Sequence, residues 1–66
     1  MPTPDLENVI EGLVDSTSLT EVLDALAAVC AAKAEHLAVN WQDHASSREW
    51  ERNARVVAQA AQKVRE

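Results

Sequence analysis

The sequence predicts an all-α protein with one domain over residues 1–66. We expect an antiparallel helical hairpin, with helices at about 19–40 and 47–64, preceded by a short helix at about 4–15. Three observations favour this fold: apolar residues recur at steps of three and four, two serine-led segments match a helix-start motif, and turn residues are scarce, with one glycine and two prolines. A sheet would need turn signals every eight to twelve residues, which the chain does not show.

The first helix is predicted from its start signal and its apolar face. Thr3 is suited to the N-cap, Pro4 to the first helical position, where a missing amide costs nothing, and Asp5 to the positive end of the helix. One face then carries the apolar residues Leu6, Val9, Ile10 and Leu13. We expect this helix to fold back over the start of the second.

The second helix is predicted from Ser18 and Glu21, which form a capping box ahead of an apolar run. The apolar stripe is too wide for a helix that is solvated all round, and its back is too polar for a membrane span. It must therefore be buried against another surface. The stripe contains Leu19, Leu23, Leu26, Cys30, Leu37 and Trp41, flanked by Val22, Ala27, Val29 and Ala34.

The third helix is predicted to begin after a second capping box, with Ser46 as the N-cap and Glu49 three residues later. The connector at 40–46 has neither glycine nor proline, so the sequence leaves open whether the second helix continues into it. The third helix has an a/d spacing over two heptads, which predicts a narrow seam. The seam residues are Trp50, Ala54, Val57, Ala61 and Val64.

Oligomerisation is expected because the chain is short. A core of this size rarely supplies more than about 3–5 kcal/mol without a disulfide, a metal or a partner chain. A single cysteine excludes an internal disulfide, and no Cys/His cluster resembles a structural zinc site. Pairing two hairpins into a helical bundle, most often with two-fold symmetry, would cover the wide stripe. The residues predicted for the core or the oligomer interface are Leu19, Leu23, Leu26, Cys30, Leu37, Trp41, Trp50 and Val57.

Three of these residues have alternatives. Cys30 is expected to be a small core hydrophobe rather than a reactive thiol, because burial opposes reactivity. Trp41 and Trp50 are expected to meet as core plugs near the turn of the hairpin, with anchoring of a partner as the alternative.

Charge and composition exclude several functions. The net charge of −5 disfavours nucleic acid as a partner. No signal peptide, transmembrane segment or lipidation motif is visible, and with a lone thiol we expect a cytoplasmic protein. Scattered carboxylate pairs do not form a catalytic constellation, so no enzymatic activity and no cofactor are expected.

Two local patterns leave alternatives open. Arg48, Arg52 and Arg55 follow one flank of the third helix, where they would contact an acidic partner or, in a dimeric hairpin, RNA. If the second helix continued through the connector, one side of it would bring together possible ligands of a divalent metal. These ligands are His36, Asn40, Asp43 and His44.

The sequence therefore predicts a small, non-enzymatic α-helical protein–protein interaction module, an adaptor or regulator, that acts as a homo-oligomer, most simply a homodimer. The RNA-binding hairpin and the metal-binding protein are the alternatives.

Overall fold

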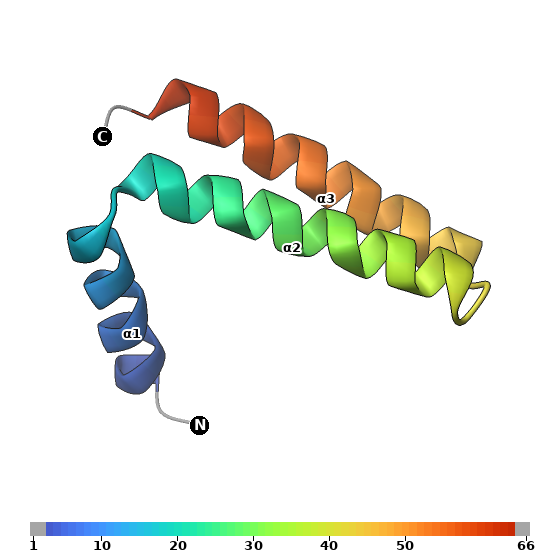
Figure 1. Ribbon diagram of the computed structural model, residues 1–66, viewed down its shortest axis with the longest axis horizontal. Coiled ribbons are helices and arrows are strands. Elements are labelled where there is room, and N and C mark those ends of the chain that lie inside the picture. Colours follow the sequence, from blue (N-terminus) through green and yellow to red (C-terminus); the bar gives the residue numbers. More distant parts are fainter. Residues whose placement is uncertain (1–2, 65–66) are drawn as a thin grey trace.

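The computed structural model describes residues 3–64, and over this range the chain is helical with short connectors. Three helices follow one another: α1 (Thr3–Ser16), α2 (Leu19–Val39) and α3 (His44–Lys63). Figure 1 shows α2 and α3 side by side, with α1 leaving the start of α2 at a steep angle. The all-α prediction and the antiparallel hairpin are confirmed.

The start of α2 follows the predicted motif. The Ser18 hydroxyl oxygen accepts a hydrogen bond from the Glu21 amide at 3.0 Å, and the Ser18 backbone is extended. Before it, Thr17 Oγ1 donates to the Leu13 carbonyl at 2.7 Å, at the end of α1. Hydroxyl groups therefore satisfy backbone groups on both sides of this connector. Thr3 is also predicted to be an N-cap, that of the first helix, but its side chain lies outside those that the structure describes.

The predicted start of α3 is wrong by three residues. Asp43, not Ser46, is the N-cap, and its carboxylate accepts from the Ser46 amide at 3.1 Å. This backbone hydrogen bond lowers the pKa of Asp43. The connector is correspondingly shorter, and Gln42 turns it with a left-handed φ of 53°. Both Asp and Ser are strong N-caps, and the earlier one adds a turn to α3.

The hairpin packs through small residues. The most buried side chains of the described range are Ala34, Ser47 and Ala61, which are 2%, 4% and 4% exposed. Ser47 Oγ donates to the Ala34 carbonyl at 2.7 Å, which links α3 directly to the backbone of α2. Small side chains allow the two helices to approach closely over this seam. The residues predicted for the seam of α3 all lie in it, half-buried or buried: Trp50, Ala54, Val57, Ala61 and Val64.

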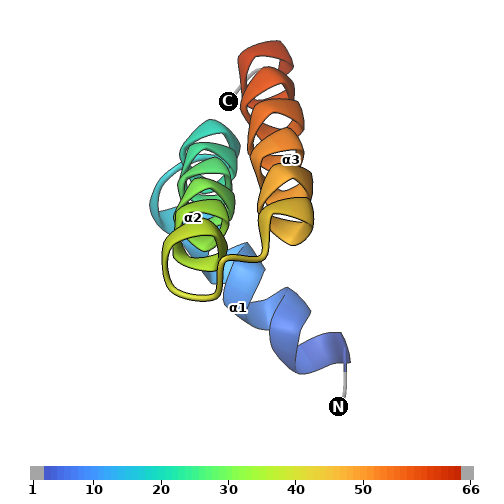
Figure 2. The ribbon, with the colours of Figure 1, turned by 90° about the vertical axis from the view of Figure 1, so that its right-hand side faces the viewer.

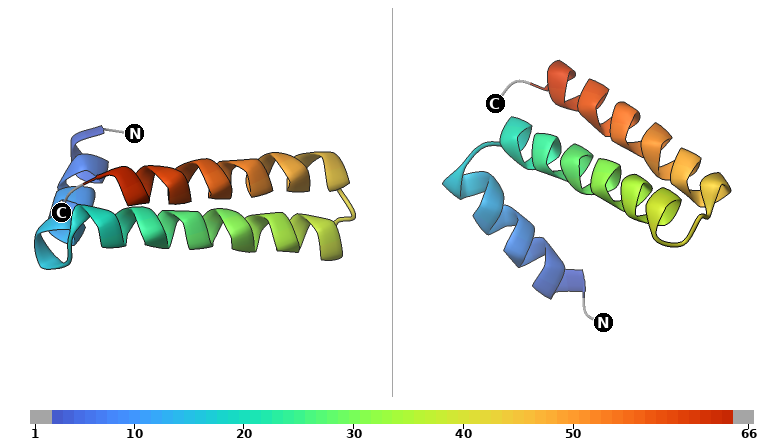
Figure 3. Two further views of the ribbon diagram at one scale, coloured as in Figure 1. Left: turned by 90° about the horizontal axis from the view of Figure 1, so that it is seen from above. Right: turned by 45° about the vertical axis from the view of Figure 1, so that its right-hand side comes forward.

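The first helix does not cover the start of α2 as predicted. The described part of α1 makes no contact with α3 and meets α2 over a small area near the connector, as the views in Figures 2 and 3 agree. Its apolar residues Leu6, Val9, Ile10 and Leu13 are 43–60% exposed, and Val14 is half-buried. Gly12 has no neighbouring atom within 4 Å of a built Cβ, so it does not mark a close helix crossing.

The shape of the chain is open. Its extents are 37 × 30 × 14 Å and its radius of gyration is 13.7 Å, whereas a compact domain of this length has a radius of about 11 Å. Across residues 3–64, no helix has the length and hydropathy needed to cross a bilayer.

Candidate interaction surface

The main surface feature is an apolar strip along α2 that neither α1 nor α3 covers, which we call the open face. It is formed by the side of α2 next to the seam and consists of Val22, Ala25, Leu26, Val29 and Ala32. Leu26 and Val29 are about half exposed. The wide stripe of the sequence is thus divided, because α3 covers its Ala34 side and leaves the Val29 side uncovered.

Two adjoining hollows follow the open face and share Val29. The narrower one, of about 300 Å³, lies where Leu13 of α1 and Thr17 of the connector approach Val22 and Leu26 of α2. The wider one, of about 640 Å³, continues along α2 to Leu37 and is closed on one side by Trp50 of α3. Together they form one apolar groove that α1 borders at one end and α3 at the other.

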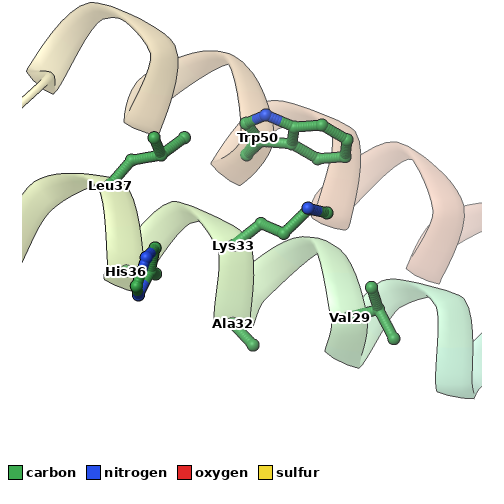
Figure 4. Close-up of a pocket in the computed structure, with 6 residues that line it drawn as sticks. All are labelled: Val29, Ala32, Lys33, His36, Leu37 and Trp50. Atoms are coloured by element: carbon green, nitrogen blue, oxygen red, sulfur yellow. The ribbon is translucent and has the colours of Figure 1, made fainter. Parts of the chain in front are cut away.

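Lys33 lies at the edge of the wider hollow. Its ammonium nitrogen is 5.4 Å from the centroid of the Trp50 ring, a cation–π geometry. Figure 4 shows the side chain rising from α2 toward the indole, while His36 and Ala32 point to the other side of the helix. Lys33 therefore keeps a positive charge at the rim of a largely apolar groove, which His36 also lines in its wider part and Glu21 in its narrower part.

His36, Asn40 and Trp41 form a polar cluster at the end of α2. The Trp41 indole nitrogen donates to His36 Nε2 at 3.0 Å, and the Asn40 side-chain amide lies 2.7 Å from His36 Nδ1. Because an indole N–H only donates, Nε2 is the acceptor of the Trp41 hydrogen bond. The Asn40 atom next to Nδ1 is the side-chain nitrogen Nδ2, and the donor and acceptor in that contact depend on the imidazole tautomer.

Trp41 does not plug the end of the hairpin as predicted. It is 69% exposed and packs edge-on against His36, with ring centroids 6.4 Å apart. Trp50, in contrast, is half-buried beside Lys33 and Leu37. The two indoles thus belong to different surroundings, and an anchoring role for Trp41 stays a prediction.

The remaining residues of the predicted interface divide between seam and groove. Leu19, Leu23, Cys30, Leu37 and Val57 are half-buried. Cys30 is a half-buried free thiol on α2. Leu37 lines the wider hollow. The part of all five residues in an oligomer stays a prediction.

The geometry does not favour the metal alternative. Helix α2 ends at Val39, so the continuous helix that would align His36, Asp43 and His44 does not form. Within residues 3–64, no three His, Cys, Asp or Glu side chains gather closely enough to hold a metal ion.

The arginines predicted to contact a partner lie on the outside of the hairpin. Arg48, Arg52 and Arg55 are exposed on α3, and Arg55 borders a shallow depression with Glu51 and Glu35. Acidic neighbours within the same depression weaken the positive potential that RNA binding needs.

Two site features escaped the sequence reasoning. The buried hydroxyl of Ser47 continues the seam one step before Trp50, and the spacing of Ser47, Trp50 and Ala54 could have indicated it. The cluster around His36 depends on the bend after α2, which leaves no periodic signal in the sequence.

The fold and the surface together define an α-helical hairpin with an uncovered apolar groove and a projecting N-terminal helix. No protein-family model, curated protein or solved structure gives a significant match to the chain.

Proposed function

We propose that this protein is a non-enzymatic, cytoplasmic interaction module, an adaptor or regulator, that acts as a homo-oligomer. The observation that supports this proposal is the amount of surface that the chain leaves exposed. Its accessible surface is 5197 Å², whereas a compact monomer of the same mass exposes about 4,100 Å². About 1,100 Å² more than a compact monomer needs is therefore accessible to a partner.

Much of this surplus is apolar. Large aliphatic side chains of α1 and α2 are about half exposed, and the residues concerned include Leu6, Val9, Ile10, Leu13, Leu26 and Val29. Contiguous exposed patches of this kind mark interaction sites in soluble proteins. In the described range, two apolar residues are almost fully buried, and both are alanines. The core of one chain is therefore small.

The ionisable groups of the groove support contact rather than catalysis. Lys33 and His36 lie along the wider hollow and Glu21 along the narrower one. Glu21 is about four turns of helix away from His36, and acid–base catalysis needs groups within hydrogen-bond reach of one reacting centre.

Light scattering over a range of protein concentrations tests the proposal. We expect a species of twice the chain mass of 7.2 kDa, or a higher multiple, that dissociates on dilution. A helical species of the chain mass at millimolar concentration would refute the homo-oligomer.

An acidic partner surface could then contact Arg48, Arg52 and Arg55, which face outward on α3. Affinity for such a partner should fall as salt is raised. The RNA alternative predicts a steeper salt dependence, with a slope set by the number of phosphates contacted.

A further inference from the structure

We propose that the open face of α2 binds a second copy of this chain, with α1 of each copy lying in the groove of the other. The inference rests on the proposed homo-oligomer and specifies the surface through which it forms. Three observations support it: the area of the exposed surface, the position of the apolar residues on α1, and the charges that face one another.

The area suits a dimer. A stable interface of standard size takes about 800 Å² from each partner. The surplus of this chain, 5197 Å² against about 4,100 Å² for a compact monomer, supplies that area with some to spare. A small contact, such as a single docked peptide side chain, would leave most of the surplus exposed.

The apolar residues of α1 are placed to reach a partner rather than their own hairpin. Leu13 at the end of α1 lies at the narrower hollow of its own chain, near Val22 and Leu26. Leu6, Val9 and Ile10 lie one to two turns farther out, 43–60% exposed. Around a two-fold axis, these three side chains would cover the wider hollow of the second copy.

The spacing and length of α1 agree with this role. Residues 6, 9, 10 and 13 have the i, i+3, i+4, i+7 spacing that helices present to an apolar groove. An isolated helix of 14 residues is only marginally stable in water, so α1 needs an apolar surface to cover it. The groove of the second copy offers that surface.

Charge favours the second copy over a membrane or nucleic acid. Helix α1 carries the acids Asp5, Glu7, Glu11 and Asp15 and no base, which opposes docking on anionic lipid or phosphate. Lys33 is the charged side chain at the rim of the wider hollow. An acidic α1 arriving from a second copy would therefore meet a cation at the edge of an apolar groove.

A matched pair of substitutions tests the surface. Val29→Glu places a carboxylate at the centre of the open face, where Val29 is 51% exposed and Lys33 one turn later can pair with it in the monomer. Val56→Glu makes the same change at a residue that is 55% exposed on the side of α3 turned away from α2. We expect Val29→Glu to raise the dimer dissociation constant at least about 100-fold, because the carboxylate would lose its hydration in an apolar interface. Val56→Glu should leave it within about threefold of the parent value.

The outcomes separate the surface from the oligomer. A parent chain that is monomeric at all concentrations refutes the homo-oligomer and this inference with it. A dimeric parent whose dissociation constant is unchanged by Val29→Glu, or changed equally by Val56→Glu, keeps the oligomer and refutes the surface.

A second measurement needs no substitution. In a mixture of isotope-labelled and unlabelled chains, filtered nuclear Overhauser spectra report contacts between copies. We expect contacts between the Ile10 methyl groups of one copy and the Val29 methyl groups of the other. Contacts between copies that involve α3 alone would refute the proposed arrangement.

Discussion

Ser47 provides the sharpest test of how the hairpin is held together. This residue is 4% exposed, and its hydroxyl donates to the Ala34 carbonyl at 2.7 Å across the seam. Ser47→Ala removes this bond, and a net hydrogen bond contributes about 0.5–1.5 kcal/mol to stability. The higher helix propensity of alanine returns up to about 0.5 kcal/mol. Because this bond is buried, we take the upper half of that range, about 1–1.5 kcal/mol, so the expected net loss is about 0.5–1 kcal/mol.

Thermal unfolding followed by circular dichroism would measure this loss. For a chain of this size, the expected loss lowers the Tm by about 2–8 °C. All variants must be compared at one protein concentration, since the Tm of an oligomer depends on it.

Ser16→Ala is the matched control for this measurement. The Ser16 hydroxyl donates to the Gly12 carbonyl at 2.8 Å, but that bond is exposed to water, so its removal should lower the Tm by less than about 2 °C. Equal melting temperatures for the parent chain and Ser47→Ala would refute the reasoning that the buried bond stabilises the seam.

Three further outcomes are expected. Asp43→Ala should lower the Tm at neutral pH. The pKa of Asp43 in the folded chain lies below the unfolded value of 3.8, so the difference in Tm between the parent and the variant should be full above pH 3.8 and should shrink as the pH falls through the lowered pKa. His36→Leu should change the Trp41 fluorescence of a Trp50→Phe chain, because it removes the acceptor of the Trp41 indole N–H; an unchanged spectrum would contradict this hydrogen bond. Gly12→Ala should increase the helicity of α1 and slow the exchange of its amide protons, because the added methyl group meets no atom within 4 Å and alanine favours a helix over glycine by about 1 kcal/mol. Unchanged amide exchange would contradict this prediction.

The helix starts show what sequence can and cannot predict. The start of α2 was predictable because Ser18, Glu21 and the apolar run after them all indicate one boundary. At α3, Asp43 and Ser46 are both good caps, and local signals do not rank them. The choice of Asp43 depends on the left-handed Gln42 and on the bond from the Asp43 amide to the Leu37 carbonyl at 3.0 Å, which form only when the bend is made.

The sequence predicts that α2 has an apolar surface for a partner, but it does not predict which part of the stripe stays exposed. The stripe on α2 is wider than one neighbour can cover, which the sequence shows directly. Which part stays uncovered depends on α3, whose small seam residues select the Ala34 side and leave Val29 in the groove. The direction of α1 is a tertiary property, and its capping residues carry no information about it.

The two-residue link between α1 and α2 makes the length of this region more critical than its composition. One residue inserted between Ile10 and Leu13 would rotate Leu6, Val9 and Ile10 by about 100° around the helix axis relative to Leu13. The aliphatic row would then no longer share a side with Leu13, which lies beside Val22. Point substitutions in this region should change the structure little, whereas single insertions or deletions should turn the apolar side of α1 away from its present direction relative to α2.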